Sequence, residues 1–273
     1  MSPRSLAQSL RVTAHGLWLF RGFILGSVRR EFQNRYRNSL LGAAWNVINP
    51  LAMIIVYTVV FSQVIGAKLP YTDKPFAYSI YLCAGVLFWN LFVEITERAK
   101  NVFLDNANLL KKLNFPHLCL PMIVVLSSLL NFVIVFALFT IFLLATGNFP
   151  GLVFVAILPL LIIQVAFSIG LGIILGVLNV FFRDVGQLFG VVVMFWFWMT
   201  PIVYTVTTLP KSIQDVMQLN PMAELVGAYQ AILLGGVWPQ WKSLWLVCVL
   251  AVVFCLLGFR LFRTHSGEMV DEL

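Results

Sequence analysis

Residues 113–182 have the sequence LNFPHLCLPMIVVLSSLLNFVIVFALFTIFLLATGNFPGLVFVAILPLLIIQVAFSIGLGIILGVLNVFF, which contains no Asp, Glu, Lys or Arg. A helix that crosses the hydrocarbon core of a bilayer needs about 20 mostly apolar residues, so this stretch is too long for one crossing. The residues TGNFPG at 146–151 lie near its middle, where glycine and proline favour a turn. The stretch therefore predicts two membrane-spanning helices, at 118–145 and 152–181.

The composition of the whole chain is typical of a membrane protein. Hydrophobic residues make up 60% of the 273 residues and charged residues only 11%, and the mean hydropathy is +0.93. A soluble domain is about half apolar and about a quarter charged. The low charge content excludes a soluble enzyme, a disordered chain and a disulfide scaffold. Other charge-free runs predict four more spans, near 40–65, 76–97, 187–206 and 242–261.

We therefore predict an all-α fold, a polytopic membrane protein with six transmembrane helices. The apolar run 225–241 contains three glycines and a proline, which disfavour a continuous crossing. We expect short re-entrant outer helices between 207 and 240, buried against protein. With this count Lys and Arg concentrate on one side, and the positive-inside rule places both termini in the cytoplasm. The expected parts are a cytoplasmic N-terminus at 1–37, a transmembrane domain at 38–262 and a cytoplasmic tail at 263–273.

Residues 15–37 predict an amphipathic helix on the inner membrane surface. Apolar side chains recur at helical spacing in this segment, at Leu17, Phe20, Ile24, Val28, Phe32 and Tyr36. Arg21 and Arg35 interrupt the stripe, and the alternative is a basic flank that only fixes the topology. The net charge of +7 requires no nucleic-acid partner, because anionic lipid headgroups account for it.

Residues for catalysis or metal binding are scarce. The three histidines lie in separate segments without metal-ligand spacing, and the four cysteines include no C-x-x-C pair. No G-x-x-x-x-G-K-[ST] phosphate loop occurs, so the chain lacks the P-loop means of binding ATP. The carboxylates lie near predicted helix ends, which disfavours ion-coupled transport. We expect no catalytic, metal or cofactor site in this chain, and an energy source outside it.

The predicted cytoplasmic segment 98–117 contains a short helix that ends before Pro116. Leu109, Leu110 and Leu113 form its apolar side, next to Lys111 and Lys112. Such a helix could place this side in a groove on a cytoplasmic partner, or it could lie on lipid. Composition alone does not separate the two.

Five motifs resemble ABC-2 type polysaccharide exporter permeases and follow the family's order over almost the whole chain. They are RYRNSLLGAAWNVINPL at 35–51, LKKLNFP at 110–116, NVFFRDV at 179–185, PIVY at 201–204 and NPM at 220–222. The first motif and the FRD triplet are the more specific ones. The chain looks like a membrane subunit that exports O-antigen, teichoic acid or a related lipid-linked glycan.

The resemblance implies a homodimer in a bacterial inner membrane, working with two copies of a separate P-loop ATPase that binds ATP and Mg. The helices within 207–240 would form an outer gate. The coupling helix docked on the ATPase would contain Asn108, Leu109, Leu110, Lys111, Lys112, Leu113 and Phe115. The cytoplasmic opening for the substrate would be bordered by Arg35, Tyr36, Arg37, Arg183 and Asp184. A salt bridge that only fixes the turn is the alternative role for Arg183 and Asp184.

Aromatic residues make up 14% of the chain, and apolar rings suit a path for sugars because the C–H face of a sugar lies against them. Stripes on the second and fifth predicted spans supply the candidate channel residues, which are Tyr78, Tyr81, Phe88, Trp89, Phe92, Trp196, Trp198 and Tyr204. The alternative is that such residues only pack the core or anchor the protein at the membrane interface. We expect that anchoring role for Trp241 and Trp245.

Polar and small residues inside the predicted spans favour helix packing. Asn131, Gln164 and Asn179 are expected to form hydrogen bonds between helices. The patterns GIILG at 172–176 and GQLFG at 186–190 permit close approach of neighbouring helices.

The predicted function is the transmembrane permease subunit of an ATP-driven exporter for a lipid-linked, O-antigen-like polysaccharide. The alternatives are an ABC-2 permease for another cargo (teichoic acid, capsule, lipid or drug) and a motor-free transporter or scaffold. The sequence does not identify the sugar.

Overall fold

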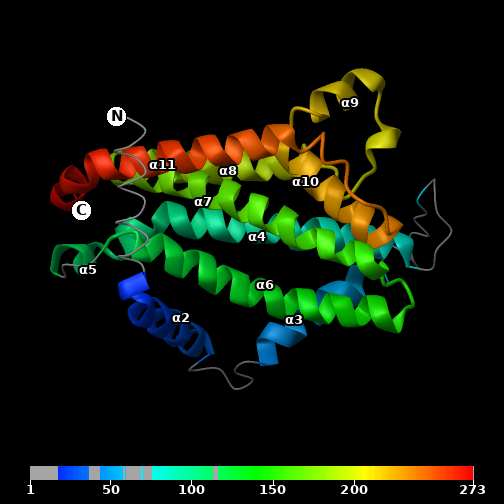
Figure 1. The fold of residues 1–273 in the computed structure, drawn as a ribbon, viewed down its shortest axis with the longest axis horizontal. Helices are drawn as coiled ribbons and strands as arrows, with labels where there is room; N and C mark the ends of the chain where they lie inside the picture. The colour runs from blue at the N-terminus through cyan, green and yellow to red at the C-terminus, as the bar shows by residue number, and fades with distance from the viewer. Residues whose placement is uncertain are drawn as a thin grey trace.

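The computed structural model describes residues 18–36, 44–57, 59, 69, 76–112 and 116–272, and the regular elements among them are helices. Figure 1 shows an elongated bundle of long helices that run side by side, with α5 at one end and α9 at the other. Four segments are long and apolar enough to cross a membrane. They are α4 (Ala77–Asp105), α6 (Cys119–Ala145), η3 with α7 (Gly151–Ala156 and Ile157–Phe181) and α11 (Trp245–Glu272).

Shorter helices complete the described part of the chain. They are α2 (Arg21–Tyr36), α3 (Trp45–Tyr57), α5 (Ala107–Lys112), α8 (Asp184–Trp198), η4 (Val206–Thr208), α9 (Lys211–Met217), α10 (Pro221–Gln230) and η5 (Ala231–Gly235).

Four of the six predicted spans coincide with these long segments. The other two fall on shorter apolar helices, Ile48–Tyr57 within α3 and all of α8. Helix α8 ends at Trp198 although the sequence predicted a span to 206, because Pro201 has no backbone N–H and disfavours helical backbone at the residue before it. Helix α11 runs on to Glu272, so the tail expected after 262 continues the helix.

Helix α4 lies at the centre of the bundle. The apolar window of α4 is mostly buried within the protein, whereas only a third or less of the window is fully buried in α6, α7 and α11. Apolar side chains that other helices leave uncovered are more stable in contact with lipid than with water. The residues carried by α4 are therefore surrounded by protein, and this helix positions most of the candidate site.

Glycines bring α7 close to α4, as the GIILG pattern predicted. A Cβ atom on Gly172 would lie 2.6 Å from the Cβ of Ala99, and one on Gly176 would lie 2.7 Å from the carbonyl oxygen of Ala99. Around Gly190, by contrast, a Cβ would meet nothing within 4 Å. The GIILG pattern at 172–176 therefore packs α7 closely against α4. In the GQLFG pattern at 186–190, Gly190 has no close neighbour.

The polar residues inside the spans form hydrogen bonds between helices, as predicted. Gln164 donates from Nε2 to the carbonyl of Phe88 at 2.6 Å. Asn131 donates to Oε2 of Glu94 at 3.0 Å. Asn179 donates to the carbonyl of Lys100 at 3.2 Å. All three bonds end on α4, so this helix is fixed to both α6 and α7.

Helix α2 shows that the segment predicted as a helix over 15–37 is helical within the part that is described, and its place on the inner membrane surface stays a prediction. The side chains of Phe20, Ile24, Val28 and Phe32 face inward, while Trp18 and Leu25 are exposed. Helix α2 packs against α6. The predicted apolar stripe is therefore covered at least partly by protein, and arginines at several positions around the helix weaken the separation of its apolar and polar faces.

Candidate functional site

An ion-pair network joins α2 to α4 and α6. The guanidinium of Arg98 on α4 donates to a carboxylate oxygen of Glu31 on α2. The other oxygen of Glu31 accepts a hydrogen bond of 2.8 Å from Ser127 on α6. Arg98 also lies 3.6 Å from Glu94, one turn earlier on α4. These charge-assisted contacts hold α2 against the bundle.

A hollow of about 530 Å³ opens between α2, α4 and α6 beside this network. Its lining includes Arg30, Glu31, Glu97, Arg98 and Asp105. Charges of both signs line one part of the hollow, and apolar side chains that include Val102, Leu120 and Val124 line the rest. It lies at the end of the bundle where α4 leads into α5.

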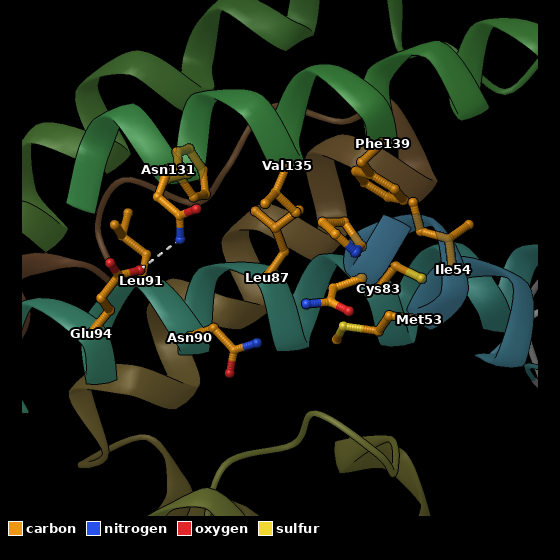
Figure 2. A pocket seen from close by; sticks show the side chains of 13 residues that line it. Met53, Ile54, Cys83, Leu87, Asn90, Leu91, Glu94, Asn131, Val135 and Phe139 are labelled. Carbon is orange, nitrogen blue, oxygen red and sulfur yellow. Dashed lines mark hydrogen bonds between the residues drawn. The ribbon is translucent and has the colours of Figure 1, made fainter. Parts of the chain in front are cut away.

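Figure 2 shows a second, apolar pocket of about 210 Å³ between α3, α4 and α6. Met53, Ile54, Leu87 and Val135 are among the apolar groups that line it. At one end the amide of Asn131 donates to Glu94, so this end is polar and hydrogen-bonded. The pocket has the chemistry to hold an apolar group and lacks the space for a polymer.

The candidate channel residues on α4 lie in a packed aromatic core. Tyr81, Phe88, Trp89 and Phe92 are buried. The ring of Phe88 stacks on Tyr229 of α10, with ring planes 4° apart. Within one copy of the chain these four rings therefore contact protein, and their part in a channel stays a prediction.

The other candidate channel residues gather near the end of α8. The hydroxyl of Tyr78 donates to the carbonyl of Val203 at 2.5 Å. The hydroxyl of Tyr81 lies 2.9 and 2.8 Å from the carbonyl oxygens of Pro201 and Tyr204 and shares its one proton between them. The PIVY motif thus supplies carbonyl acceptors for two tyrosines of α4. Tyr204 is half-buried.

The indole of Trp196 donates to Oδ1 of Asn220 at 2.8 Å. The same oxygen accepts from the backbone N–H of Met222 and so caps α10. The NPM motif therefore starts α10 and fixes its position against α8. Trp198 is 61% exposed and is the candidate channel residue of α8 that points away from the core.

The predicted coupling residues lie on and just after α5. Only Asn106 separates α5 from α4, and its side chain donates back to the carbonyl of Val102 at 2.8 Å. Leu110 is buried in a cluster with Phe103 of α4 and Phe262 of α11, and Leu109 packs against this cluster. The leucine side expected to face a partner thus contacts the chain's own bundle. Asn108 and Lys111 are exposed. The side chain of Lys112, and all of Leu113 and Phe115, lie outside the described residues.

The sequence profile of the family described as ABC-2 type transporter matches residues 24–234. The chain belongs to this family.

Relatives of the ABC-2 chain cover nearly its full length. It is 30% identical to the O-antigen export system permease protein RfbA of Myxococcus xanthus, over 94% of this chain and 97% of the relative. It is 27% identical to the protein of the same name from Klebsiella pneumoniae, over 89% and 92%. The polysialic acid transport protein KpsM of Escherichia coli is 19% identical, over 89% and 93%.

The residues predicted to border the cytoplasmic opening are only partly described in the ABC-2 chain. Arg183, just before α8, and Asp184, the first residue of α8, are both exposed. In the described part of the chain, neither takes part in an ion pair, so the salt bridge that was the alternative role is not formed there. Asp184 lies in the first turn of α8, where a carboxylate interacts favourably with the helix dipole. The side chains of Arg35 and Tyr36, and all of Arg37, lie outside the described residues.

Sequence reasoning missed two polar groups that organise the end of the bundle near α5, Glu31 and Lys100. A signal for Glu31 was present, because it is the only carboxylate among the first 72 residues. A single acid within a basic segment indicates a specific cationic partner, which is Arg98. Among the described residues, no group of three or more His, Cys, Asp and Glu side chains could hold a metal ion.

Proposed function

We propose that this ABC-2 chain is the transmembrane permease subunit of an ATP-driven exporter that moves a lipid-linked, O-antigen-like polysaccharide across a bacterial inner membrane. The observation that carries the proposal is the family match over 24–234, together with relatives that are named polysaccharide export or transport proteins and align over almost their whole length. Identity is higher to the two O-antigen permeases than to the polysialic acid protein, which favours O-antigen over capsule as the cargo.

The energy source in this proposal is a separate P-loop ATPase, present in two copies, that binds ATP and Mg. No phosphate-loop sequence occurs in the chain itself. Helix α5 would dock on the ATPase through its exposed residues Asn108 and Lys111. Leu110 would instead anchor α5 to the bundle. Movement of α5 then passes to α4, because one residue joins the two helices.

The transport path is proposed to form between two copies of the chain. Helix α8 supports this idea, because it presents exposed apolar side chains at Leu188, Val191, Phe195 and Trp198. In a homodimer such a face could cover its counterpart or line a path that admits the apolar faces of sugars. Trp198 and the half-buried Tyr204 and Trp196 lie nearest to such a surface.

In this arrangement α3 and α8 complete six spans, with both termini in the cytoplasm. The short helices from η4 to η5 would gate the outer end. Their burial differs, since α10 is packed on α4 while α9 has no buried residue. Helix α2, with Arg35 to Arg37, would border the cytoplasmic opening together with Arg183 and Asp184.

The test is export in the native host together with purification of the complex. Deletion of the gene should remove the surface polysaccharide and leave lipid-linked glycan inside the cell. The chain, expressed with the ATPase encoded beside it, should co-purify with that ATPase, and Lys111→Glu should weaken the complex. The matched control is Lys242→Glu at the opposite end of the bundle, which should leave the complex intact. Failure to bind any P-loop ATPase would contradict the proposal, and unchanged surface glycan would point to another cargo.

A further inference from the structure

Lys100 is a buried lysine near the cytoplasmic end of α4. The residue is 5% exposed, and its Nζ lies 2.5 Å from Oε2 of Glu97 and 5.6 Å from the centre of the Phe189 ring. The Nζ also donates to the carbonyl of Gly186 at 2.9 Å. Burying a charge is unfavourable unless it is paired and hydrogen-bonded, and ionisable residues within membrane bundles mark functional positions more often than surface residues do.

Asn179 on α7 makes a second set of bonds at the same place. Its amide nitrogen donates to the carbonyl of Lys100 and to the side-chain oxygen of Asn101, each at 3.2 Å. Its oxygen accepts from the backbone N–H of Gly186 at 3.1 Å. Both backbone polar groups of Gly186 therefore bind a neighbouring helix, the oxygen to α4 and the nitrogen to α7.

The fit around Gly186 leaves no room for a side chain. A Cβ atom there would lie 2.7 Å from Oδ1 of Asn179, so any other residue would push the amide away. Along α8, whose residues are all described, Phe189 is the only buried side chain, and the Lys100 ammonium lies over its ring. The first two turns of α8 are thus fixed mainly by this set of contacts.

The same contacts begin close to α5. Lys100 lies within two turns of the end of α4, and Asn106 alone separates that end from α5. Hydrogen bonds to backbone atoms leave less freedom than contacts between two long side chains, because the backbone atoms cannot rotate away. A displacement of α5 would therefore be transmitted to the first turn of α8 with little loss of amplitude.

We propose that Lys100, Asn179 and Gly186 form a mechanical link that carries movement of α5 to α8 during transport. The proposal rests on the proposed function, since it assumes that an ATPase moves α5. Lys100 and Asn179 are positioning residues in this scheme, because they act through α8 and need not touch the cargo. The competing explanation is that these contacts only stabilise the fold.

The link can be cut from each of its three helices. Lys100→Met removes the charge and the bond to Gly186 while retaining a long apolar side chain. Asn179→Leu removes the amide bonds from α7, and Gly186→Ala displaces the amide from the α8 side. The matched controls are Gly190→Ala on the same helix, where space is open, and Lys242→Met, an exposed lysine at the opposite end. Lys100→Arg keeps the charge and the donors.

The variants are compared as complexes with the ATPase in proteoliposomes loaded with the host's lipid-linked glycan. We measure the amount of assembled complex, the rate of ATP hydrolysis and the glycan moved per ATP. We expect normal assembly and continued ATP hydrolysis in the three link variants, with glycan moved per ATP lowered about tenfold, the effect of losing one charge-assisted hydrogen bond on an equilibrium. Lys100→Arg should retain more transport than Lys100→Met, and both controls should match the wild type.

A distance measurement tests the link without transport. Spin labels at Asp105, on the exposed end of α4, and at Leu188, on exposed α8, should give one narrow distance distribution in the wild-type chain. The distribution should broaden in Lys100→Met and in Asn179→Leu, because α8 is then free to move relative to α4. It should stay narrow in Gly190→Ala.

The outcomes separate the link from the proposed function. If the wild-type chain binds no ATPase and moves no glycan, the proposed function fails, and the label distances still decide whether the link holds α8. If the wild type exports and all three variants move as much glycan per ATP, the link is refuted. A parallel loss of assembly, ATP hydrolysis and export in all three variants also refutes it, because that pattern indicates a stabilising role alone.

Discussion

The contact of Glu31 with Arg98 predicts that α2 detaches from the bundle when this pair is broken. Arg98→Met removes the guanidinium that lies between Glu31 and Glu94. Glu31→Gln keeps an oxygen that can accept from Ser127 and removes only the charge. We therefore expect the arginine substitution to have the larger effect, because it removes the positive charge next to both carboxylates.

The exposure of the Arg98 and Glu31 side chains determines how much free energy is lost when their ion pair is broken. The side chain of Arg98 is 25% exposed and that of Glu31 is 36% exposed, so solvent screens the pair in part. Exposed ion pairs contribute about 0.2–1 kcal/mol, and breaking a buried pair costs about 3–5 kcal/mol. An intermediate value of about 1–2 kcal/mol applies to Arg98→Met. Since about 1.4 kcal/mol is a factor of ten, the equilibrium for undocking of α2 should rise about five- to thirtyfold.

Hydrogen exchange of the purified chain in nanodiscs measures this equilibrium directly. Amides of α2 should exchange about five- to thirtyfold faster in Arg98→Met and less so in Glu31→Gln, while those of α7 should not change. Arg260→Met, an exposed arginine on α11, is the matched control. Unchanged exchange in α2 for both substitutions would refute the reasoning, as would an equal acceleration throughout the bundle.

Three further predictions concern the aromatic core, the helix contact and pH. Trp89 is 4% exposed, so Trp89→Ala should destabilise the chain by about 3–5 kcal/mol in a detergent melting assay. Trp198→Ala should leave the melting temperature nearly unchanged and lower export. The reverse pattern would remove Trp198 from the proposed path. Gly176→Val should force α4 and α7 apart and destabilise the chain by about 1–3 kcal/mol, while Gly190→Ala should leave the stability unchanged. Equal melting temperatures for the two variants would contradict the packing of α7 against α4. Burial lowers the pKa of His117 below its ordinary value of 6.5. The unfolded chain therefore binds the proton more readily, and the stability of the fold should decrease as the pH drops below 6.5. His117→Asn should weaken this pH dependence in a series of melting curves.

Local hydropathy predicted the long helices, because the length of an uncharged run is a property of the sequence itself. The break at 146–151 and the close approach at Gly172 and Gly176 followed from local chemistry in the same way. The early end of α8 was not predicted. Uncharged residues continue past Trp198 to Pro210, and the length of that run does not show how strongly Pro201 opposes helix there.

Contacts between residues far apart in the sequence determine which surfaces cover the predicted faces, and local sequence patterns do not show these contacts. Leu110 looked available for a partner, but Phe262, more than 150 residues later, covers it together with Phe103. The aromatic stripe of α4 looked like a channel wall, but Tyr229 and Phe167 fill the space beside it. In both cases the pattern predicted a face that contacts another surface and did not show which surface that is.

Arg98 and Lys100 give α4 two links that point in different directions. Each residue of a helix turns by about 100°, so side chains two positions apart lie on nearly opposite sides. Arg98 accordingly reaches α2 and Lys100 reaches α8. The two links share α4 but no bonding partner, and loss of both should therefore add in free energy. Arg98→Met/Lys100→Met should show the undocking of α2 seen with the first substitution and the broadened α4–α8 distances seen with the second, each unchanged by the other. A mutual effect would mean that α4 does not hold its own shape between the links, and movement of α5 could then not reach α2 and α8 independently.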